Sequence, residues 1–287
     1  MKYARIKAYG KINIGLNIKG VENGFHALET IMAEINYYDL ITAKSRKDDV
    51  VNVSFTGIKN NELNGFNSNV YKTARLFAQQ FKTNGVDIKV KKNIPVGSGL
   101  GGSSADIVGT VKAMAELYGI KEGLTEFVNT LCSDGEFLMR GGCALVEGRG
   151  SVVREIVPES ILYMVIVTPE TEISTKDVFE EFDKDTYPSS NADLSDCISY
   201  LENGAPLNSC VAFNALFEPS CKLNPLIREA FCDVKKLSPT LCGMSGSGSS
   251  VFGIFDSLDL CLWARDKLIH KWDNACVTET IKRKNCK

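Results

Sequence analysis

The chain has 287 residues, of which 44% are hydrophobic, enough for the cores of one large or two ordinary domains. Its 33 basic and 35 acidic residues nearly balance, which argues against a nucleic-acid-binding or membrane-surface protein. No stretch approaches the ~20 apolar residues that cross a bilayer, and the first residues lack the apolar segment of a signal peptide. We therefore expect a globular, cytoplasmic protein.

The ten cysteines do not indicate a disulfide framework or a metal centre. None are spaced Cys-x-x-Cys, and His26 and His270 are the two histidines of the sequence. Clusters of cysteine and histidine typical of structural metal sites cannot be built from this set. We expect free thiols in a reducing compartment.

The predicted elements mix strands and helices along the chain. Period-two alternation predicts strands at 11–18, 50–55 and 86–90, and helical spacing predicts helices at 69–82 and 107–117. A second domain is predicted to start at Pro158. It contains a buried strand at 161–167, a helix over 175–182, a loop at 183–196, helices at 221–238 and 257–272, and a strand at 250–255. The pattern favours an α+β protein with domains 1–157 and 158–287.

The most informative segment is 94–105, with four glycines and three serines between a predicted strand and a predicted helix. The first N–H groups of a helix have no intrahelical partner, so this junction favours an anion such as phosphate. A flexible turn is the alternative, but such a turn does not require Pro95 or Leu100. The candidate nucleotide-binding residues here are Pro95, Gly97, Ser98, Gly99, Leu100, Gly101, Gly102, Ser103 and Ser104.

The loop is not a Walker motif, because no lysine follows Gly101 and Gly102. It resembles motif two of the GHMP kinases, Pro-x-Gly-x-Gly-Leu-Gly/Ser-Ser-Ser-Ala. Residues 8–16, with Lys11 and Asn13, resemble motif one, and residues 243–250 resemble motif three. The resemblance implies an α+β, two-domain fold, with a left-handed βαβ crossover in the N-terminal ATP-binding domain and a ferredoxin-like C-terminal domain. It also implies ATP and Mg²⁺ as cofactors.

Within this superfamily, the chain most resembles the 4-diphosphocytidyl-2-C-methyl-D-erythritol kinases. The specific string is Gly-Phe-His-x-Leu-Glu at 24–29, and the segments 67–76, 132–148 and 173–179 also match. An aromatic ring can stack on cytosine, and an imidazole can pair with the edge of the base. The alternative for the aromatic–histidine pair is a core phenylalanine beside a histidine that caps a turn.

The resemblance assigns a role to each candidate residue. Asp134 and Lys11 are the expected catalytic residues, and Lys92 joins the glycine-rich loop in binding ATP. The expected substrate-binding residues are Asn13, Phe25, His26, Thr175, Phe179, Gly246 and Ser247. The expected reaction is phosphorylation of the 2-hydroxyl of a cytidine diphosphate-linked sugar alcohol, by a monomer or homodimer.

The chain also departs from the family pattern. Gly135 and Glu136 stand where Val-Pro is usual after the aspartate, Cys132 replaces a glycine, and Ser68 stands near the place of an asparagine. A change next to Asp134 can move its carboxylate. Two alternatives therefore stay open: another small-molecule GHMP kinase of the homoserine or mevalonate type, and a weakly active or non-catalytic paralogue.

Overall fold

The computed structural model describes residues 2–22, 24–57, 67–148, 150, 152–170, 173–184 and 192–282, without the side chains of Glu22 and Phe25. Contacts divide the chain into two units. The first contains Met1–Gly10, Tyr37–Pro95 and Gly101–Arg140, and the second contains Lys11–Asn36, Val96–Leu100 and Gly141–Lys287. Each unit combines separate stretches of chain, so this division does not test the predicted boundary after residue 157, which stays a prediction.

Strands β1 (Tyr3–Glu22) and β2 (Phe25–Ser45) pair with each other and run through both units. In the first unit, the C-terminal part of β2 pairs antiparallel with β4 (Val86–Lys92), and β4 pairs parallel with β3 (Val51–Gly57). Helix α1 (Asn69–Phe81) connects β3 to β4. These three elements form a βαβ unit, as the resemblance implies.

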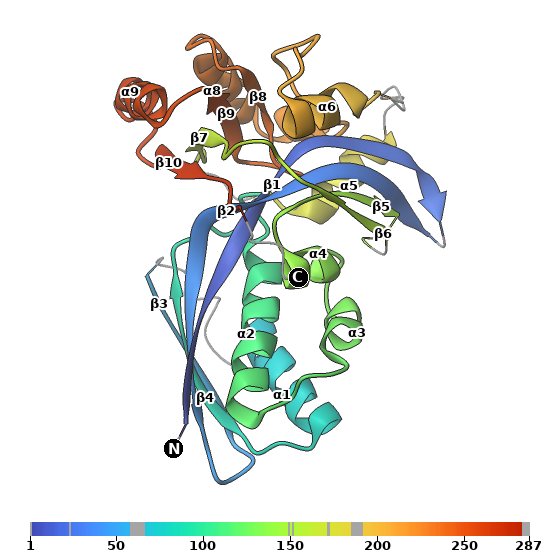
Figure 1. Cartoon of the computed structure of the whole chain (residues 1–287), viewed down its shortest axis with the longest axis vertical. Coiled ribbons are helices and arrows are strands. Elements are labelled where there is room, and N and C mark those ends of the chain that lie inside the picture. The colour runs from blue at the N-terminus through green and yellow to red at the C-terminus, as the bar shows by residue number, and fades with distance from the viewer. Residues whose placement is uncertain are drawn as a thin grey trace. The chain divides into compact units, whose positions relative to one another are not determined.

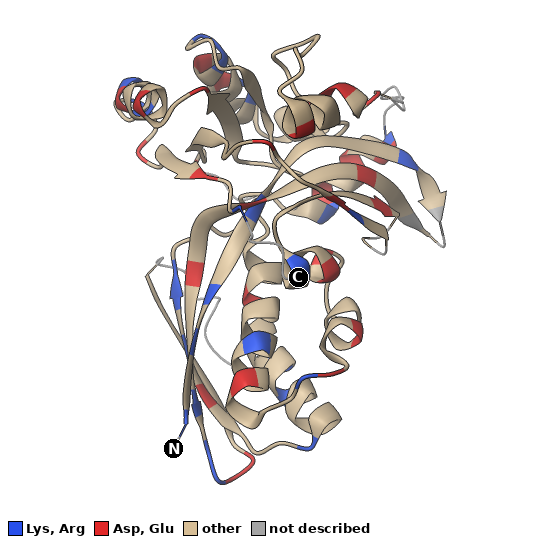
Figure 2. Cartoon of the chain, viewed as in Figure 1, with Lys and Arg blue, Asp and Glu red and all other residues tan. Residues whose placement is uncertain are grey.

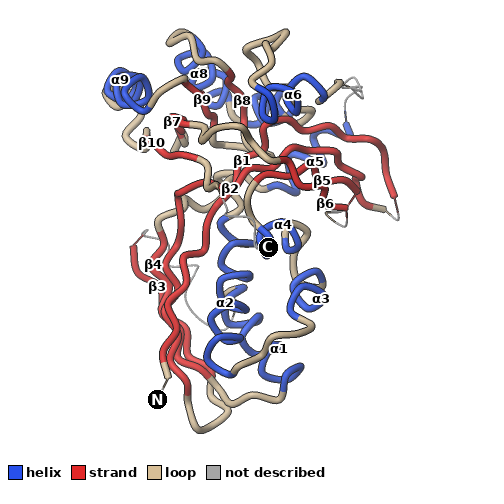
Figure 3. The backbone as a smooth tube through the Cα atoms, viewed as in Figure 1, coloured by secondary structure: helices blue, strands red, loops and turns tan. Residues whose placement is uncertain are grey.

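Helix α1 forms because its apolar residues recur at helical spacing and its first turn is capped. Val70, Thr73, Ala74 and Phe77 are buried. The backbone N–H of Tyr71 donates to the hydroxyl of Ser68, the N-cap residue, at 3.2 Å. Helix α2 (Gly102–Tyr118) lies beside α1, as Figures 1 and 3 show. The short helices α3 (Leu124–Asn129) and α4 (Gly135–Arg140) complete the described helices of this unit.

Strand β4 alternates between buried and exposed positions over its whole length. Val86, Ile88, Val90 and Lys92 point inward, while the intervening residues are half-buried or exposed. A lysine therefore occupies the fourth inward position of the strand, next to the start of the glycine-rich loop.

The second unit holds the rest of the strands. The N-terminal part of β2 pairs antiparallel with β5 (Cys143–Gly148), and β5 pairs with β6 (Val152–Ile156). A separate antiparallel sheet has the order β10-β7-β9-β8. Its strands are β7 (Tyr163–Val167), β8 (Leu241–Met244), β9 (Val251–Phe255) and β10 (Cys276–Glu279). Val165 and Val251 of this sheet are completely buried in a hydrophobic core.

Five described helices belong to the second unit. They are α5 (Thr175–Lys184), α6 (Ser195–Asn203), α7 (Phe217–Leu223), α8 (Pro225–Lys235) and α9 (Leu258–Leu268). The single helix predicted at 221–238 is wrong, because α7 ends at Leu223 and α8 begins at Pro225. Asn224 accepts a hydrogen bond from the N–H of Leu226, and proline is suited to the first position of a helix but not to its interior.

The charge distribution agrees with the composition. Figure 2 shows acidic and basic residues interspersed along both units. Among the described residues, no helix is both long and apolar enough to span a membrane. The described cysteines are all free thiols.

Candidate active site

The second unit holds a buried hydrogen-bond chain that starts at motif one. The ammonium of Lys11 donates to the Oδ1 of Asn13 at 2.6 Å, and the amide of Asn13 donates to the hydroxyl of Thr30 at 2.8 Å. Thr30 in turn donates to the carbonyl of Gly15 at 2.6 Å. Lys11 and Asn13 are 6% and 2% exposed. Their side-chain orientations are therefore fixed by these hydrogen bonds and not by solvent.

Motif three is joined to motif one and to the glycine-rich loop by Ser245. Its hydroxyl accepts from the N–H of Asn13 at 3.2 Å and donates to the carbonyl of Gly99 at 3.0 Å. The N–H of Lys11 donates to the carbonyl of Leu100 at 2.9 Å. A Cβ atom built on Gly246 would lie 3.4 Å from the ammonium of Lys11. The three motifs are thus brought together within this unit, around one lysine.

The segment Val96–Leu100 and the turn after β8 also share backbone hydrogen bonds. The N–H of Ser249 donates to the carbonyl of Gly97 at 3.3 Å, and that of Ser250 donates to the carbonyl of Ser98 at 3.0 Å. Gly97 and Gly99 have φ angles of 65° and 75°, which glycine adopts without strain.

Gly99→Ala is expected to disrupt nucleotide binding. A Cβ on Gly99 would overlap the carbonyl oxygen of Ser245 and lie 2.8 Å from that of Gly248, so the loop must move. Gly119→Ala is the matched control, because Gly119 has a similar φ of 73° but no atom within 4 Å of such a Cβ. We expect the KM for ATP to rise at least about tenfold in Gly99→Ala and to change little in Gly119→Ala. Equal KM values in the two variants would contradict the role of the loop.

Helix α5 carries two of the predicted substrate-binding residues on one face, because four positions separate Thr175 from Phe179. The hydroxyl of Thr175 lies 3.0 Å from that of Ser247. The ring of Phe179 stacks on the imidazole of His26, with the centroids 4.7 Å apart and the planes at 25°. His26 is at the start of β2. The side chain of Phe25 lies outside the described residues.

The first unit holds the remaining candidate residues. Helix α2 begins after Gly101, whose φ of 73° ends the loop, and no side chain caps its first turn. The amide of Asn69, the first residue of α1, donates to the hydroxyl of Ser103 at 2.7 Å. An uncapped helix N-terminus with a glycine before it is suited to a phosphate group.

Lys92 is 4% exposed and lies between two buried carboxylates. Its ammonium donates to Asp39 and, at 2.7 Å, to Asp106 of α2. Asp39 also accepts from the N–H groups of Asn93 and Ile94, at 2.6 and 2.9 Å. This cluster fixes the end of β4 to the first turns of α2. A direct contact of Lys92 with ATP stays a prediction.

Burial and neighbouring charges shift the pKa values of Asp106 and Lys92. Burial, partly opposed by Lys92 and reinforced by Asp39, raises the pKa of Asp106 to about 7 from 3.8. The Oδ1 of Asp106 is buried and has no hydrogen-bond partner among the described residues. Burial alone would lower the pKa of Lys92, but the two carboxylates outweigh it and raise that pKa. One ammonium therefore faces two buried carboxyl groups.

Asp134 is half-buried and immediately precedes α4, where its carbonyl accepts from the N–H of Leu138 at 2.9 Å. Gly135, the departure from the family pattern, is buried, and a Cβ there would lie 2.5 Å from a methyl of Val128. The residue after it, Glu136, pairs with Arg140 at 2.5 Å. The Gly-Glu sequence is therefore adapted to close packing between α3 and α4.

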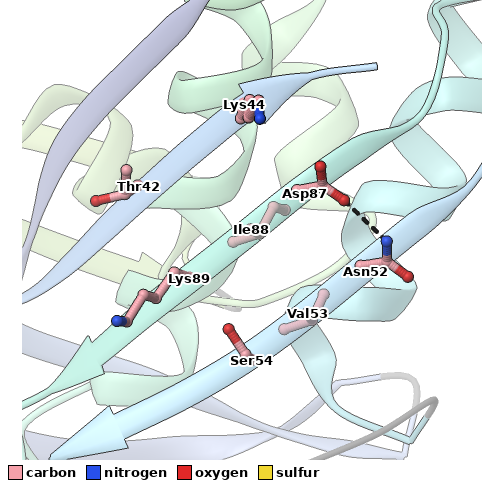
Figure 4. Close-up of a pocket in the computed structure, with 8 residues that line it drawn as sticks. All are labelled: Thr42, Lys44, Asn52, Val53, Ser54, Asp87, Ile88 and Lys89. Carbon is pink, nitrogen blue, oxygen red and sulfur yellow. Dashed lines mark hydrogen bonds between the residues drawn. The ribbon is translucent and has the colours of Figure 1, made fainter. Parts of the chain in front are cut away.

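A shallow cavity of about 250 Å³ lies elsewhere in the first unit, on the sheet formed by β2, β4 and β3 (Figure 4). In it the amide of Asn52 donates to the carboxylate of Asp87 at 2.8 Å. None of the predicted site residues lines this cavity. Its lining consists of Thr42, Lys44, Asn52, Val53, Ser54, Asp87, Ile88 and Lys89.

This fold and the three connected motifs define the GHMP kinase class. The sequence model described as the GHMP kinases N terminal domain matches residues 68–143. The 4-diphosphocytidyl-2-C-methyl-D-erythritol kinase of Clostridium beijerinckii is 30% identical over 290 residues, covering 96% of this chain and all of the relative. The enzyme of the same name from Syntrophomonas wolfei is 31% identical, over 91% of this chain and 93% of its own length. The chain belongs to the family of these kinases.

A solved structure agrees with this assignment. The crystal structure of a 4-(cytidine 5'-diphospho)-2C-methyl-D-erythritol kinase superposes with a TM-score of 0.80 and 25% identity, over 96% of this chain and 99% of its own. The predicted fold class is therefore confirmed, as is the resemblance to the GHMP kinases.

Sequence reasoning missed several residues around the candidate site. Ser245, Thr30, Asp39 and Asp106 were not predicted, although each makes a buried hydrogen bond to a predicted residue. Asp183, which contacts His26, was also missed. It falls in the loop predicted at 183–196, whereas α5 continues to Lys184 and places Asp183 four residues after Phe179 on the same helix.

Proposed function

We propose that the chain transfers the γ-phosphate of ATP to the 2-hydroxyl of 4-diphosphocytidyl-2-C-methyl-D-erythritol, in the non-mevalonate route to isoprenoid precursors. Membership of the kinase family over the full length of its relatives supports the reaction and the acceptor. The relatives are named as kinases of a small molecule, which supports a cytoplasmic location for this chain.

The structural observation that carries this proposal is the connection of the three motifs at Lys11. Its ammonium is oriented by Asn13, and its backbone is tied to the glycine-rich loop. In phosphoryl transfer, positioning and charge stabilisation supply most of the acceleration, and no covalent intermediate is required. A buried, oriented ammonium is suited to offset the negative charge that develops on the transferred group or the attacking oxygen.

The other residues act on the phosphates and on the proton. Backbone N–H groups of the glycine-rich loop and of the first turn of α2 would hold the ATP phosphates. Asp134 would orient the acceptor hydroxyl and accept its proton. On the acceptor side, Asn13, Thr175, Gly246 and Ser247 would contact the substrate, and His26 with Phe179 would contact the cytosine.

Magnesium is expected to arrive bound to ATP. In the described parts of the chain, no group of three or more His, Cys, Asp or Glu side chains is arranged to hold a metal ion. Kinase sites commonly hold Mg²⁺ through substrate phosphates with one or two carboxylates, so the residues present are compatible with it. When bound, the ion neutralises phosphate charge.

The acceptor preference tests the proposed function. With purified protein, ATP and Mg²⁺, the rate of ADP formation is measured with the diphosphocytidyl substrate, homoserine and mevalonate. We expect kcat/KM for the first to exceed the other two by at least about a hundredfold, because the cytidyl group contributes binding energy that they lack. A higher kcat/KM for homoserine or mevalonate would favour another GHMP kinase, and no turnover of any acceptor would favour a non-catalytic paralogue.

A further inference from the structure

His26 is held from two directions by helix α5. Phe179 covers one face of its imidazole, and the ring of Phe182 meets it edge-on at 6.0 Å. Its Nε2 lies 2.8 Å from the Oδ1 of Asp183. The His26 side chain is 18% exposed and that of Asp183 is 56% exposed, so the pair lies at the surface of the unit with the imidazole largely covered.

The stacking distance restricts how a base can contact this histidine. Ring atoms in contact are about 3.5–4.0 Å apart, so a base between two rings requires their centroids to be about 7–8 Å apart. The observed 4.7 Å leaves no such space between His26 and Phe179. In this arrangement the imidazole can meet a base through its edge, where its nitrogens lie.

The contact with Asp183 determines which nitrogen carries the hydrogen. A carboxylate only accepts hydrogen bonds, so Nε2 must be the donor. In a neutral imidazole, a hydrogen on Nε2 leaves Nδ1 as an acceptor. Within the described residues, Asp183 is the hydrogen-bond partner of the His26 ring.

Helix α5 is anchored so that Asp183 is held in place. On its buried side, Val178 is completely inaccessible. The carboxylate of Glu181 is 8% exposed and pairs with Lys222 at 2.6 Å. Thr175, at the start of the helix, contacts Ser247 of motif three. Thr175, Phe179 and Asp183 follow at intervals of four, so one helix face extends from motif three to His26.

We propose that Asp183 is a positioning residue for base specificity: it holds the Nε2–H of His26, so that Nδ1 accepts a hydrogen bond from the amino group of cytosine. Uracil carries a carbonyl oxygen in place of that amino group, and two acceptors facing each other are repelled. This inference rests on the proposed function, which places a cytidyl group in the acceptor. Asp183 itself need not touch the substrate.

The experiment measures base selectivity at one fixed pH of about 8. Binding of CMP and UMP is measured by calorimetry in the parent, Asp183→Asn and Asp183→Ala, and their inhibition constants are measured against the diphosphocytidyl acceptor. Asp177→Asn is the matched control, because it removes the same charge from an exposed position of α5. Asp183→Glu tests rescue by a carboxylate.

We expect the CMP-over-UMP preference to fall about tenfold in Asp183→Ala, the effect of losing one oriented hydrogen bond. The fall should be smaller in Asp183→Asn, because the amide oxygen can still accept from Nε2. The preference should be retained in Asp177→Asn and partly restored in Asp183→Glu. The KM for ATP should not change in any variant, since the predicted ATP-binding residues lie outside α5. A preference that stays within about twofold of the parent in Asp183→Ala would overturn the proposal.

Nitrogen NMR separates this proposal from the proposed function, and the two histidines of the chain keep the spectrum simple. The parent should show His26 with Nε2 protonated and Nδ1 unprotonated at about pH 8. An unprotonated Nε2 would overturn the role of Asp183 whatever the substrate. A protonated Nε2 together with equal binding of CMP and UMP would instead contradict the cytidyl acceptor, and the inference would fall with it.

Discussion

Asp134→Asn is expected to lower kcat by about a hundredfold or more while ATP still binds. The carboxamide keeps the size of the side chain but cannot take the proton of the acceptor hydroxyl, and loss of a positioned base typically has an effect of this size. The measurement is steady-state turnover with the diphosphocytidyl acceptor, together with calorimetric titration of ATP. Burial and the carboxylate of Asp134 raise the pKa of Cys132 to about 12, so this neighbouring thiol cannot replace the missing base.

Glu136→Gln provides the matched control for this prediction. It makes the same change of carboxylate to carboxamide two residues away, where Glu136 pairs with Arg140 on α4. The amide oxygen of glutamine can still accept from Arg140, whose side chain is 60% exposed, so kcat should change little. If Asp134→Asn kept turnover within about threefold of the parent, Asp134 would not be the catalytic residue.

Lys92→Met is expected to destabilise the protein by about 3–5 kcal/mol, because it leaves the buried carboxyl groups of Asp39 and Asp106 without a counter-charge. The free energy of unfolding is measured by chemical denaturation. The double variant Lys92→Met/Asp106→Asn should recover part of the loss, because one of the two carboxyl groups is then neutral. A loss below about 1 kcal/mol in Lys92→Met would contradict the account of this cluster.

Asp106→Asn is the control for Lys92→Met, and its effect depends on pH. The pKa of Asp106 in the folded protein, about 7, lies above its ordinary value of 3.8. The folded state therefore holds this proton more tightly, and the corresponding stability is present below pH 3.8 and lost as the pH rises through 7. In Asp106→Asn the loss over this window should be absent, and the Lys92–Asp39 pair keeps its charge balance.

The sequence predicted local features well where the periodicity was strong. The alternation of Val86, Ile88 and Val90 predicted β4, and the same period places Lys92 inward, although it was predicted only to contact ATP. Helical periodicity over 221–238 predicts one helix, whereas Asn224 and Pro225 separate α7 from α8. The fold class and the family followed from the three motifs.

Contacts between distant parts of the chain could not be predicted from local spacing. Asn13 and Ser245 are 232 residues apart, and only folding of the second unit shows that one hydroxyl connects motif one to the glycine-rich loop. Asp39 and Lys92 are 53 residues apart, and their pairing depends on the register of β2 against β4. The roles of these residues in binding and catalysis stay predictions.

The central claim is transfer of the γ-phosphate of ATP to one hydroxyl of one acceptor, and the identity of the product tests it most directly. Purified protein is incubated with ATP, Mg²⁺ and 4-diphosphocytidyl-2-C-methyl-D-erythritol, and the product is analysed by mass spectrometry and phosphorus NMR. We predict one new phosphate monoester, on the 2-hydroxyl, formed in equal amount to ADP. ADP formation without this product, or a phosphate on a different hydroxyl, would contradict the account.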